Sequence, residues 1–155
     1  CCVVIVAAIG RRVISGKTDV IMMLNGAIGG LVASTEEPLA PSSLAAILIG
    51  GVGGLIVVLG TKLLFSLKID DVVGAIPAHL FAGIWGTLAV PLTNADASFG
   101  AQLTGVLAVN IFVFVVALII WGIMKNTVGI RLSKEAERLG TDVAETGVIA
   151  YAIRD

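Results

Sequence analysis

The chain has 155 residues, of which 57% are hydrophobic and 14% are charged, and its mean hydropathy is +1.06. An average soluble domain is about 45–50% apolar and about 25% charged, and a small soluble domain leaves much of its surface in water. These values argue against a water-soluble enzyme, a nucleic-acid-binding protein and a disordered segment. The net charge of −1 indicates no polyanionic partner.

The chain begins with Cys1 and Cys2, which lead directly into an apolar stub over residues 1–9 that stops at Arg11 and Arg12. A lipid-modified amino terminus can also begin with cysteine. The absence of a polar spacer favours the alternative, in which the stub is the end of a membrane helix and both thiols are small apolar side chains. Because the first residue is not Met, we expect a fragment of a longer protein.

Four further apolar segments follow, and a spanning helix needs about 20 mainly apolar residues. The hydroxyl of Thr18 is expected to cap the first segment, and Ser42 or Ser43 the second. Asp70 and Asp71 precede the third, where carboxylates complement the positive end of the helix dipole. The expected helices cover residues 20–34, 44–67, 72–92 and 100–124.

After residue 124 the sequence becomes mixed and charged, with one short helix expected over residues 134–139. The sequence predicts an all-α, polytopic transmembrane helix bundle with four spanning helices, an N-terminal helix stub and a cytoplasmic tail. Residues 1–124 would form the transmembrane part of a domain that is incomplete at its N-terminus, and residues 125–155 the tail.

The basic residues predict the orientation, because short cytoplasmic loops carry an excess of Lys and Arg. Alternating spans place all ten Lys and Arg residues on one side. The opposite side receives the loop with Glu36 and Glu37 and the loop with Asp96. We therefore expect a multi-pass protein of the cell membrane with a cytoplasmic C-terminus.

Glycines on three of the segments have the spacing of helix-packing residues. Small residues three or four positions apart let helix backbones approach closely in a membrane. The pairs are Gly26 and Gly30, Gly50 and Gly54, and Gly83 and Gly86.

His79 is the single histidine and lies within the third segment, two residues after Pro77. An ionisable group inside a membrane is costly and indicates function by default. A neutral imidazole offers one donor and one acceptor, which suits a small polar solute or a proton relay. The alternative is a histidine that only bonds a neighbouring helix. Pro77 lacks an N–H and is expected to open or kink the helix near this position.

Other polar residues of the spans are candidates for pore lining or helix support. Asn25 can bridge helices by hydrogen bonds, and Thr35 is either a cap-like or a lining residue. Asp70 and Asp71 are interpreted first as caps and second as a proton or ion site. We find no catalytic pair, metal-ligand cluster or phosphate loop, so neither an enzyme nor a cofactor is expected.

Three segments together resemble the ammonium transporter (Amt/Mep/Rh) family. Residues 25–35 (NGAIGGLVAST) are similar to its eighth-helix signature, and residues 69–87 (IDDVVGAIPAHLFAGIWGT) to its tenth. Residues 128–151 resemble its cytoplasmic carboxyl-terminal region. The order, spacing and sidedness of the segments agree, and the resemblance covers nearly the whole chain.

The resemblance implies ammonium transport: ammonium is taken at the outer face, and ammonia passes through a hydrophobic, histidine-lined pore. His79 matches the second histidine of the family's pore pair, whose first member lies on a helix that this chain lacks. The resemblance also implies a homotrimer in membrane lipid and raises a PII-type signalling protein as a partner at the cytoplasmic face.

The chain departs from the family pattern at Leu80, where many members have glycine, at Pro77, and at Thr146, where a histidine is common. These differences indicate a divergent subgroup. Two alternatives to transport stay open: an ammonium-sensing membrane receptor of the same family without net transport, and a structural bundle in which His79 only packs.

Overall fold

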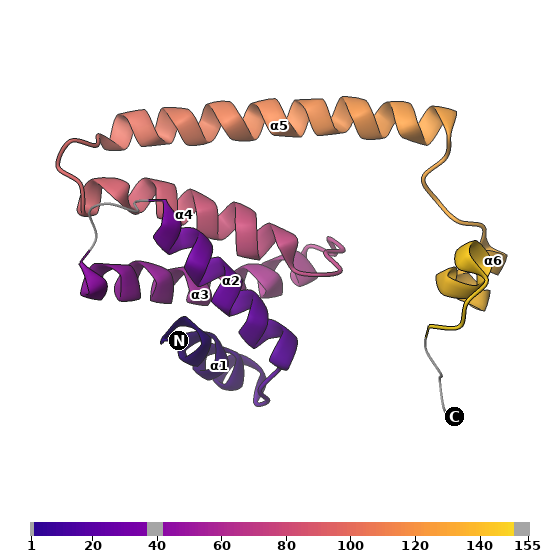
Figure 1. Ribbon diagram of the computed structural model, residues 1–155, viewed down its shortest axis with the longest axis horizontal. Coiled ribbons are helices and arrows are strands. Elements are labelled where there is room, and N and C mark those ends of the chain that lie inside the picture. The colour runs from indigo at the N-terminus through magenta and orange to yellow at the C-terminus, as the bar shows by residue number, and fades with distance from the viewer. Residues whose placement is uncertain (1, 37–41, 151–155) are drawn as a thin grey trace. The chain divides into compact units, whose positions relative to one another are not determined.

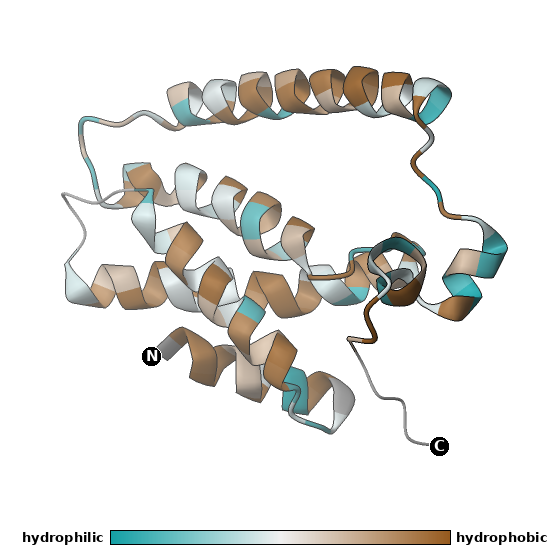
Figure 2. Ribbon diagram, turned by 45° about the vertical axis from the view of Figure 1, so that its right-hand side comes forward, coloured by the Kyte–Doolittle hydropathy of each residue, from teal (hydrophilic) through white to brown (hydrophobic). Residues whose placement is uncertain are grey.

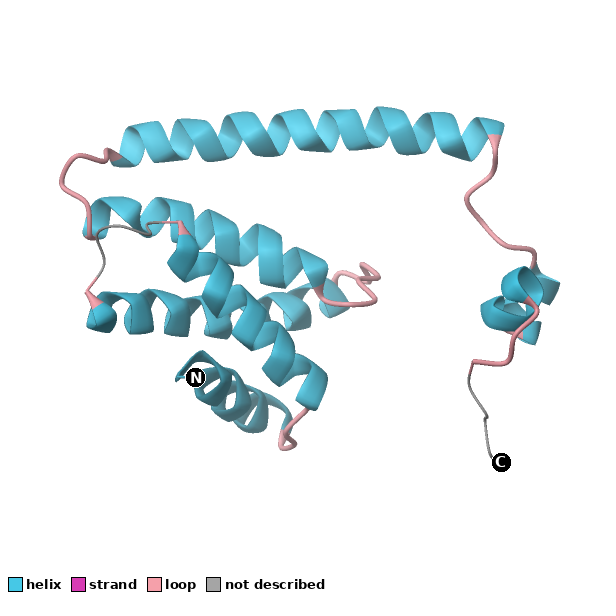
Figure 3. Ribbon diagram, viewed as in Figure 1, coloured by secondary structure: helices cyan, strands magenta, loops and turns pink. Residues whose placement is uncertain are grey.

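The computed structural model describes residues 2–36 and 42–150, and the regular elements in these ranges are helices (Figures 1 and 3). The chain divides into two compact units, unit 1 (Cys1–Val109) and unit 2 (Asn110–Asp155). The elements in chain order are α1 (Cys2–Ser15), α2 (Val20–Thr35), α3 (Ser43–Ser66), the π-helix η1 (Ile76–Phe81), α4 (Ala82–Ala89), the 3₁₀ turn η2 (Val90–Leu92), α5 (Phe99–Thr127), α6 (Lys134–Leu139) and the π-turn η3 (Asp142–Thr146).

Unit 1 is built around α2 and α3, which pack on each other while α1 contacts both (Figure 1). The η1 and α4 helices pack against the same pair. Two small hydrophobic clusters form the core, one at Val57, Val58 and Ala78 and one at Ala33, Ile49 and Ala89. The buried side chains of the described residues are apolar, so packing contacts hold these helices together.

The structure corrects two expected boundaries near the amino terminus. The stub does not stop before its arginines: α1 continues through Arg11 and Arg12 to Ser15, because long basic side chains are good helix formers. The cap of α2 is Asp19 rather than Thr18. Its carboxylate accepts hydrogen bonds from the backbone N–H groups of Ile21 (2.9 Å) and Met22 (3.4 Å).

The next two helices begin differently. Ser42 caps α3 as expected, accepting from the Ala45 N–H at 3.2 Å. The helix expected from residue 72 begins only at residue 75. Residues 72–74 form a turn instead, because Gly74 adopts a left-handed φ of +74° that a continuous helix does not allow.

The α5 helix has 29 residues and is brown over most of its length in Figure 2. At 1.5 Å per residue it is about 43 Å long, longer than the roughly 30 Å of a bilayer's hydrocarbon core. In the part of the chain that the structure describes, two helices, α3 and α5, are long and apolar enough to cross a membrane, and residues 20–35 and 76–92 form shorter apolar helices. The number of four spans stays a prediction.

Unit 2 contains the rest of α5 and the charged tail. The short helix expected over residues 134–139 is confirmed as α6. Ser133 caps it by accepting from the Ala136 N–H at 3.1 Å, and Arg131 pairs with Glu137 at 3.2 Å. Beyond it, the Asp142 carboxylate accepts from the Ala150 N–H at 2.8 Å, which folds the end of the described tail back on η3.

Glycines allow close contact between the helices of unit 1. A Cβ atom added at Gly53 of α3 would lie 2.9 Å from the Gly29 carbonyl oxygen of α2. One added at Gly86 of α4 would lie 2.6 Å from the Ala33 carbonyl oxygen of α2. The packing role expected from spacing therefore holds at Gly86 and also at Gly26, Gly30, Gly50 and Gly54, whereas Gly83 has only ordinary contacts.

We predict that Gly53→Ala lowers the free energy of unfolding by about 1–3 kcal/mol, because the new methyl group would overlap backbone atoms of α2. Gly51→Ala, on the same helix, is the matched control: its methyl group meets only Val6 Cγ2 at 3.8 Å. It should leave stability unchanged or raise it by up to about 1 kcal/mol. Denaturant titrations in detergent micelles compare the two, and equal stability of both variants would contradict the packing argument.

Candidate functional site

His79 lies in the middle of η1, where the helix is wider than an α-helix. The Ala82 N–H donates to the carbonyl oxygens of His79 and Pro77, and the bond to Pro77 spans the five residues of a π-turn. Single π-turns are rare and occur frequently at functional sites. The opening expected from Pro77 is thus present as a π-helical turn around His79.

The packing of η1 determines which way His79 faces. Pro77 and Ala78 are buried, and a Cβ at Gly60 of α3 would lie 3.2 Å from Pro77 Cβ. A Cβ at Gly29 of α2 would lie 3.5 Å from the Ala78 carbonyl oxygen. His79 and Leu80 are exposed, so His79 is on the side of the helix that α2 and α3 do not cover. That it borders a passage stays a prediction.

The start of η1 is held by a carboxylate. Asp71 accepts hydrogen bonds from the N–H groups of Ala75 and Ile76, both at 2.9 Å, and thus acts as the cap. Asp70 and Asp71 both line a cavity of about 120 Å³, together with Thr61 and Gly74. The two carboxylates therefore share one cavity, and Asp71 in addition fixes the helix end about one turn before His79.

Asn25 connects α2 to the same region. Its side-chain N–H donates to the Val73 carbonyl oxygen at 2.8 Å. The amide nitrogen also occupies the space where a side chain at Gly74 would project. Asn25 thus holds the turn that precedes η1, which is a bridging role from α2 to the His79 segment.

The other end of α2 carries Thr35 and Glu36. The Thr35 hydroxyl donates to the Val32 carbonyl oxygen at 3.0 Å, so its oxygen retains lone pairs that can accept. Glu36 ends the helix, and its Cγ lies 2.7 Å from the position of a Cβ at Gly86. Sequence reasoning placed Glu36 only in a loop. A negative charge at the carboxyl end of a helix is unfavourable, because that end carries a partial negative charge. This unfavourable position could have singled out Glu36 in the sequence.

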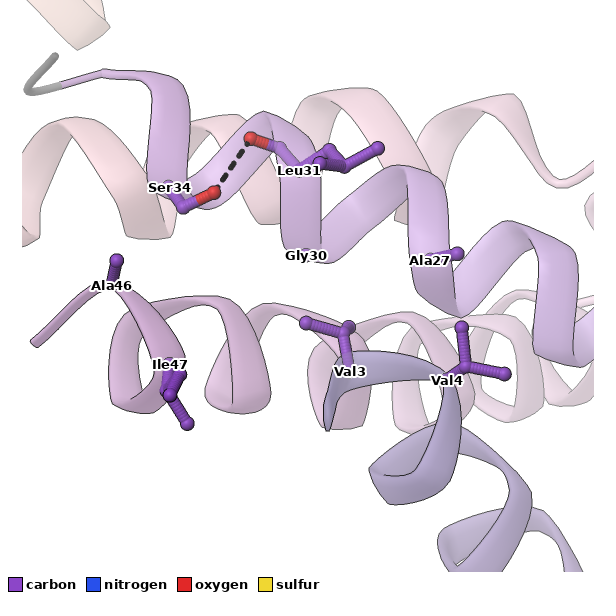
Figure 4. Close-up of a pocket in the computed structure, with 8 residues that line it drawn as sticks. All are labelled: Val3, Val4, Ala27, Gly30, Leu31, Ser34, Ala46 and Ile47. Carbon is purple, nitrogen blue, oxygen red and sulfur yellow. Dashed lines mark hydrogen bonds between the residues drawn. The ribbon is translucent and has the colours of Figure 1, made fainter. Parts of the chain in front are cut away.

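A separate groove of about 290 Å³ lies among α1, α2 and α3 (Figure 4). Val3, Val4 and Ile47 line it, and its one hydroxyl, that of Ser34, donates to the Leu31 carbonyl oxygen at 3.1 Å (Figure 4). An apolar groove without a charged group has no means of selecting a cation, so it is a poor candidate for the site.

Trp85 packs against the second cluster, and its indole N–H donates to the Ile49 carbonyl oxygen at 3.0 Å. This bond ties α4 to α3. Among residues 2–36 and 42–150, no group of three His, Cys, Asp or Glu residues is placed to hold a metal ion.

Comparison with known proteins gives one consistent result. Residues 1–151 match the model of a family described as the Ammonium Transporter Family. A Synechocystis sp. protein, provisionally named an ammonium transporter, is 39% identical over 133 residues, which cover 84% of this chain and 30% of that protein. The ammonium transporter Amt2 of Archaeoglobus fulgidus is 38% identical over 158 residues, covering 88% of this chain and 34% of that protein. The chain spans about a third of the length of these relatives.

We predict that Asp71→Ala lowers the free energy of unfolding by about 1 kcal/mol and speeds amide hydrogen exchange at Ala75 and Ile76, because both N–H groups lose their acceptor. Asp70→Ala removes the same charge one residue earlier and should leave that exchange unchanged. Equal exchange in the two variants would show that the cap does not hold η1.

Proposed function

The chain belongs to the Ammonium Transporter Family, and we propose that it forms the carboxyl-terminal part of a protein that moves ammonium across the cell membrane. As a member of a transporter family it is not an enzyme. Its helical structure and apolar helices fit a membrane protein. Ammonium and ammonia are the proposed substrates, and membrane lipid is the proposed surrounding.

The position of His79 carries this proposal. It is an exposed imidazole on a π-turn of an apolar helix. Ammonium is a strongly hydrated cation, and moving a charge into an apolar passage is costly, whereas neutral ammonia crosses at much lower cost. We propose that ammonium is taken at the outer face and gives up a proton there, and that ammonia passes His79, whose ring offers one donor and one acceptor to the solute. The imidazole hands on the released proton, so that net charge crosses together with the ammonia.

The exposed side of η1 is consistent with a chain that forms one part of a larger pore. The relatives are about three times as long as this chain, and in such a protein further helices would cover His79. We propose a homotrimer in which each protomer has its own pore. The charged tail and the inner loops are the proposed contacts of a PII-type signalling protein at the cytoplasmic face.

The supporting residues are proposed to keep this helix in place rather than to touch the solute. Asp71 caps η1, and Asn25 holds the turn before it. Asp70 borders a small cavity at the same end, where it is proposed to support the helix start. Thr35 lies at the opposite end of α2, which is proposed to face outward.

His79→Ala in the protein expressed from its complete gene should reduce methylammonium uptake and ammonium-evoked current by about a hundredfold or more, the contribution typical of a positioned group that transfers protons. Val72→Ala is the control, since this turn residue of the same segment is 88% exposed and should change neither quantity. Uptake assays in cells and current recordings in a bilayer measure the effect.

Unchanged uptake and current in His79→Ala would remove His79 from the pathway and support the purely structural alternative. A wild-type protein that changes conformation with ammonium but carries no current would support the sensing receptor. Each result contradicts a different part of the proposal.

A reporter fused after Asp155 should be active in the cytoplasm, because the proposed orientation places all ten Lys and Arg residues on the inner side. A second fusion, inserted between Asn94 and Asp96, should report the outer side. A reporter pair with the opposite or an identical location would overturn the orientation.

A further inference from the structure

Glu36 reaches from the end of α2 onto the helix that carries His79. One carboxylate oxygen, Oε1, is 3.9 Å from the position of a Cβ at Gly83, and the Cγ lies close over Gly86. Gly83 follows His79 by four residues, so it lies about 6 Å farther along the helix axis, on the side that faces Val32 and Glu36 of α2. A larger residue at Gly86 would displace the glutamate, so the glycine makes room for it.

The surroundings of Glu36 add to its negative charge. Glu36 is the C-cap of α2, and the free carbonyl groups at a helix carboxyl end carry a partial negative charge. The Thr35 hydroxyl donates a hydrogen bond to the Val32 carbonyl oxygen, so its own oxygen retains lone pairs that can accept. Within residues 2–36 and 42–150 no ion pair neutralises Glu36. This end of unit 1 therefore attracts cations.

Resting on the proposed function, we propose that Glu36 is a specificity-determining residue that concentrates ammonium at the outer end of the His79 helix. A small cation with N–H donors gains from the carboxylate and the neighbouring acceptors, whereas a neutral solute does not. The cation reaches a carboxylate about one helical turn before it meets the imidazole. Glu36 thus acts on capture of the substrate and not on its passage.

Glu36→Gln in the complete protein tests this role, because it removes the charge and keeps the shape that packs over Gly86. The KM for methylammonium uptake should rise about two- to tenfold, the range expected for one exposed charge at this separation. The maximal rate should stay unchanged. The difference should shrink as salt is raised from about 0.1 M to 1 M, since the screening length falls from about 10 Å to 3 Å.

Two control variants sharpen the experiment. Glu36→Asp keeps the charge and should keep a KM close to that of the wild type. Asp96→Asn removes one charge from the other loop that is expected to face outward, and its KM should not change. Asp96 lies after α4 in the turn formed around Asn94, and not over Gly83.

The outcomes separate the inference from the proposed function. If the wild type takes up methylammonium and Glu36→Gln has the same KM as the wild type, the inference is overturned and the proposed function stands. A lower maximal rate that does not depend on salt would also overturn the inference, because it would indicate a structural role for Glu36. An equal rise of the KM in Asp96→Asn would overturn it as well, because it would indicate a general effect of surface charge. A wild type without uptake would overturn both.

Discussion

Backbone-to-backbone contact at glycine is the constraint on which the arrangement of unit 1 depends. In a membrane, lipid tails are as apolar as leucine, so helices associate through van der Waals contact and weak Cα–H···O bonds that need close approach. The α2 helix provides this contact to both of its neighbours, at Gly29 and Gly30 against Gly53 and Gly50 of α3 and at Ala33 against Gly86 of α4. Because α2 holds α3 and α4 at short range, the buried side of α4 is fixed, and the side that carries His79 is fixed with it.

The π-turn of this helix carries the exposed His79. A π-turn holds one more residue than an α-turn, and within this one Pro77 and Ala78 are buried while His79 is exposed. Residues outside the π-turn satisfy the free N–H groups at its start and hold the loop before it. Asp71 satisfies two N–H groups before it, and Asn25 anchors the loop that Gly74 shapes. The polar residues of this segment therefore form a support for one imidazole.

Much of the local structure of this chain can be predicted from its sequence, whereas the packing of its helices can be predicted only in part. Ser42 and the short helix α6 obey ordinary capping and composition rules, so they are predictable. The late start of η1 depends on the positive φ of Gly74 and on the reach of Asp71 to two N–H groups, and neither follows from periodicity. Spacing identified Gly26 and Gly50 as packing residues but missed Gly29 and Gly53. A glycine-rich helix has small residues on several of its faces, and which face is packed depends on the position of the neighbouring helix. The surroundings of His79 could not be predicted from a chain about a third as long as its relatives.

The exposed surface itself is of two kinds. The α5 helix exposes large apolar side chains around its circumference, such as Phe112, Val115 and Trp121, and such a surface is compatible with lipid at any rotation. The exposed face of η1 differs, because it carries an imidazole, and a polar group in hydrocarbon without a partner costs several kcal/mol, on the order of 2–7. That cost makes lipid a poor neighbour for His79 and favours protein or a solute with hydrogen-bonding groups. The exposed surfaces of α5 and η1 thus differ in chemistry, and the imidazole of His79 is the side chain that distinguishes them.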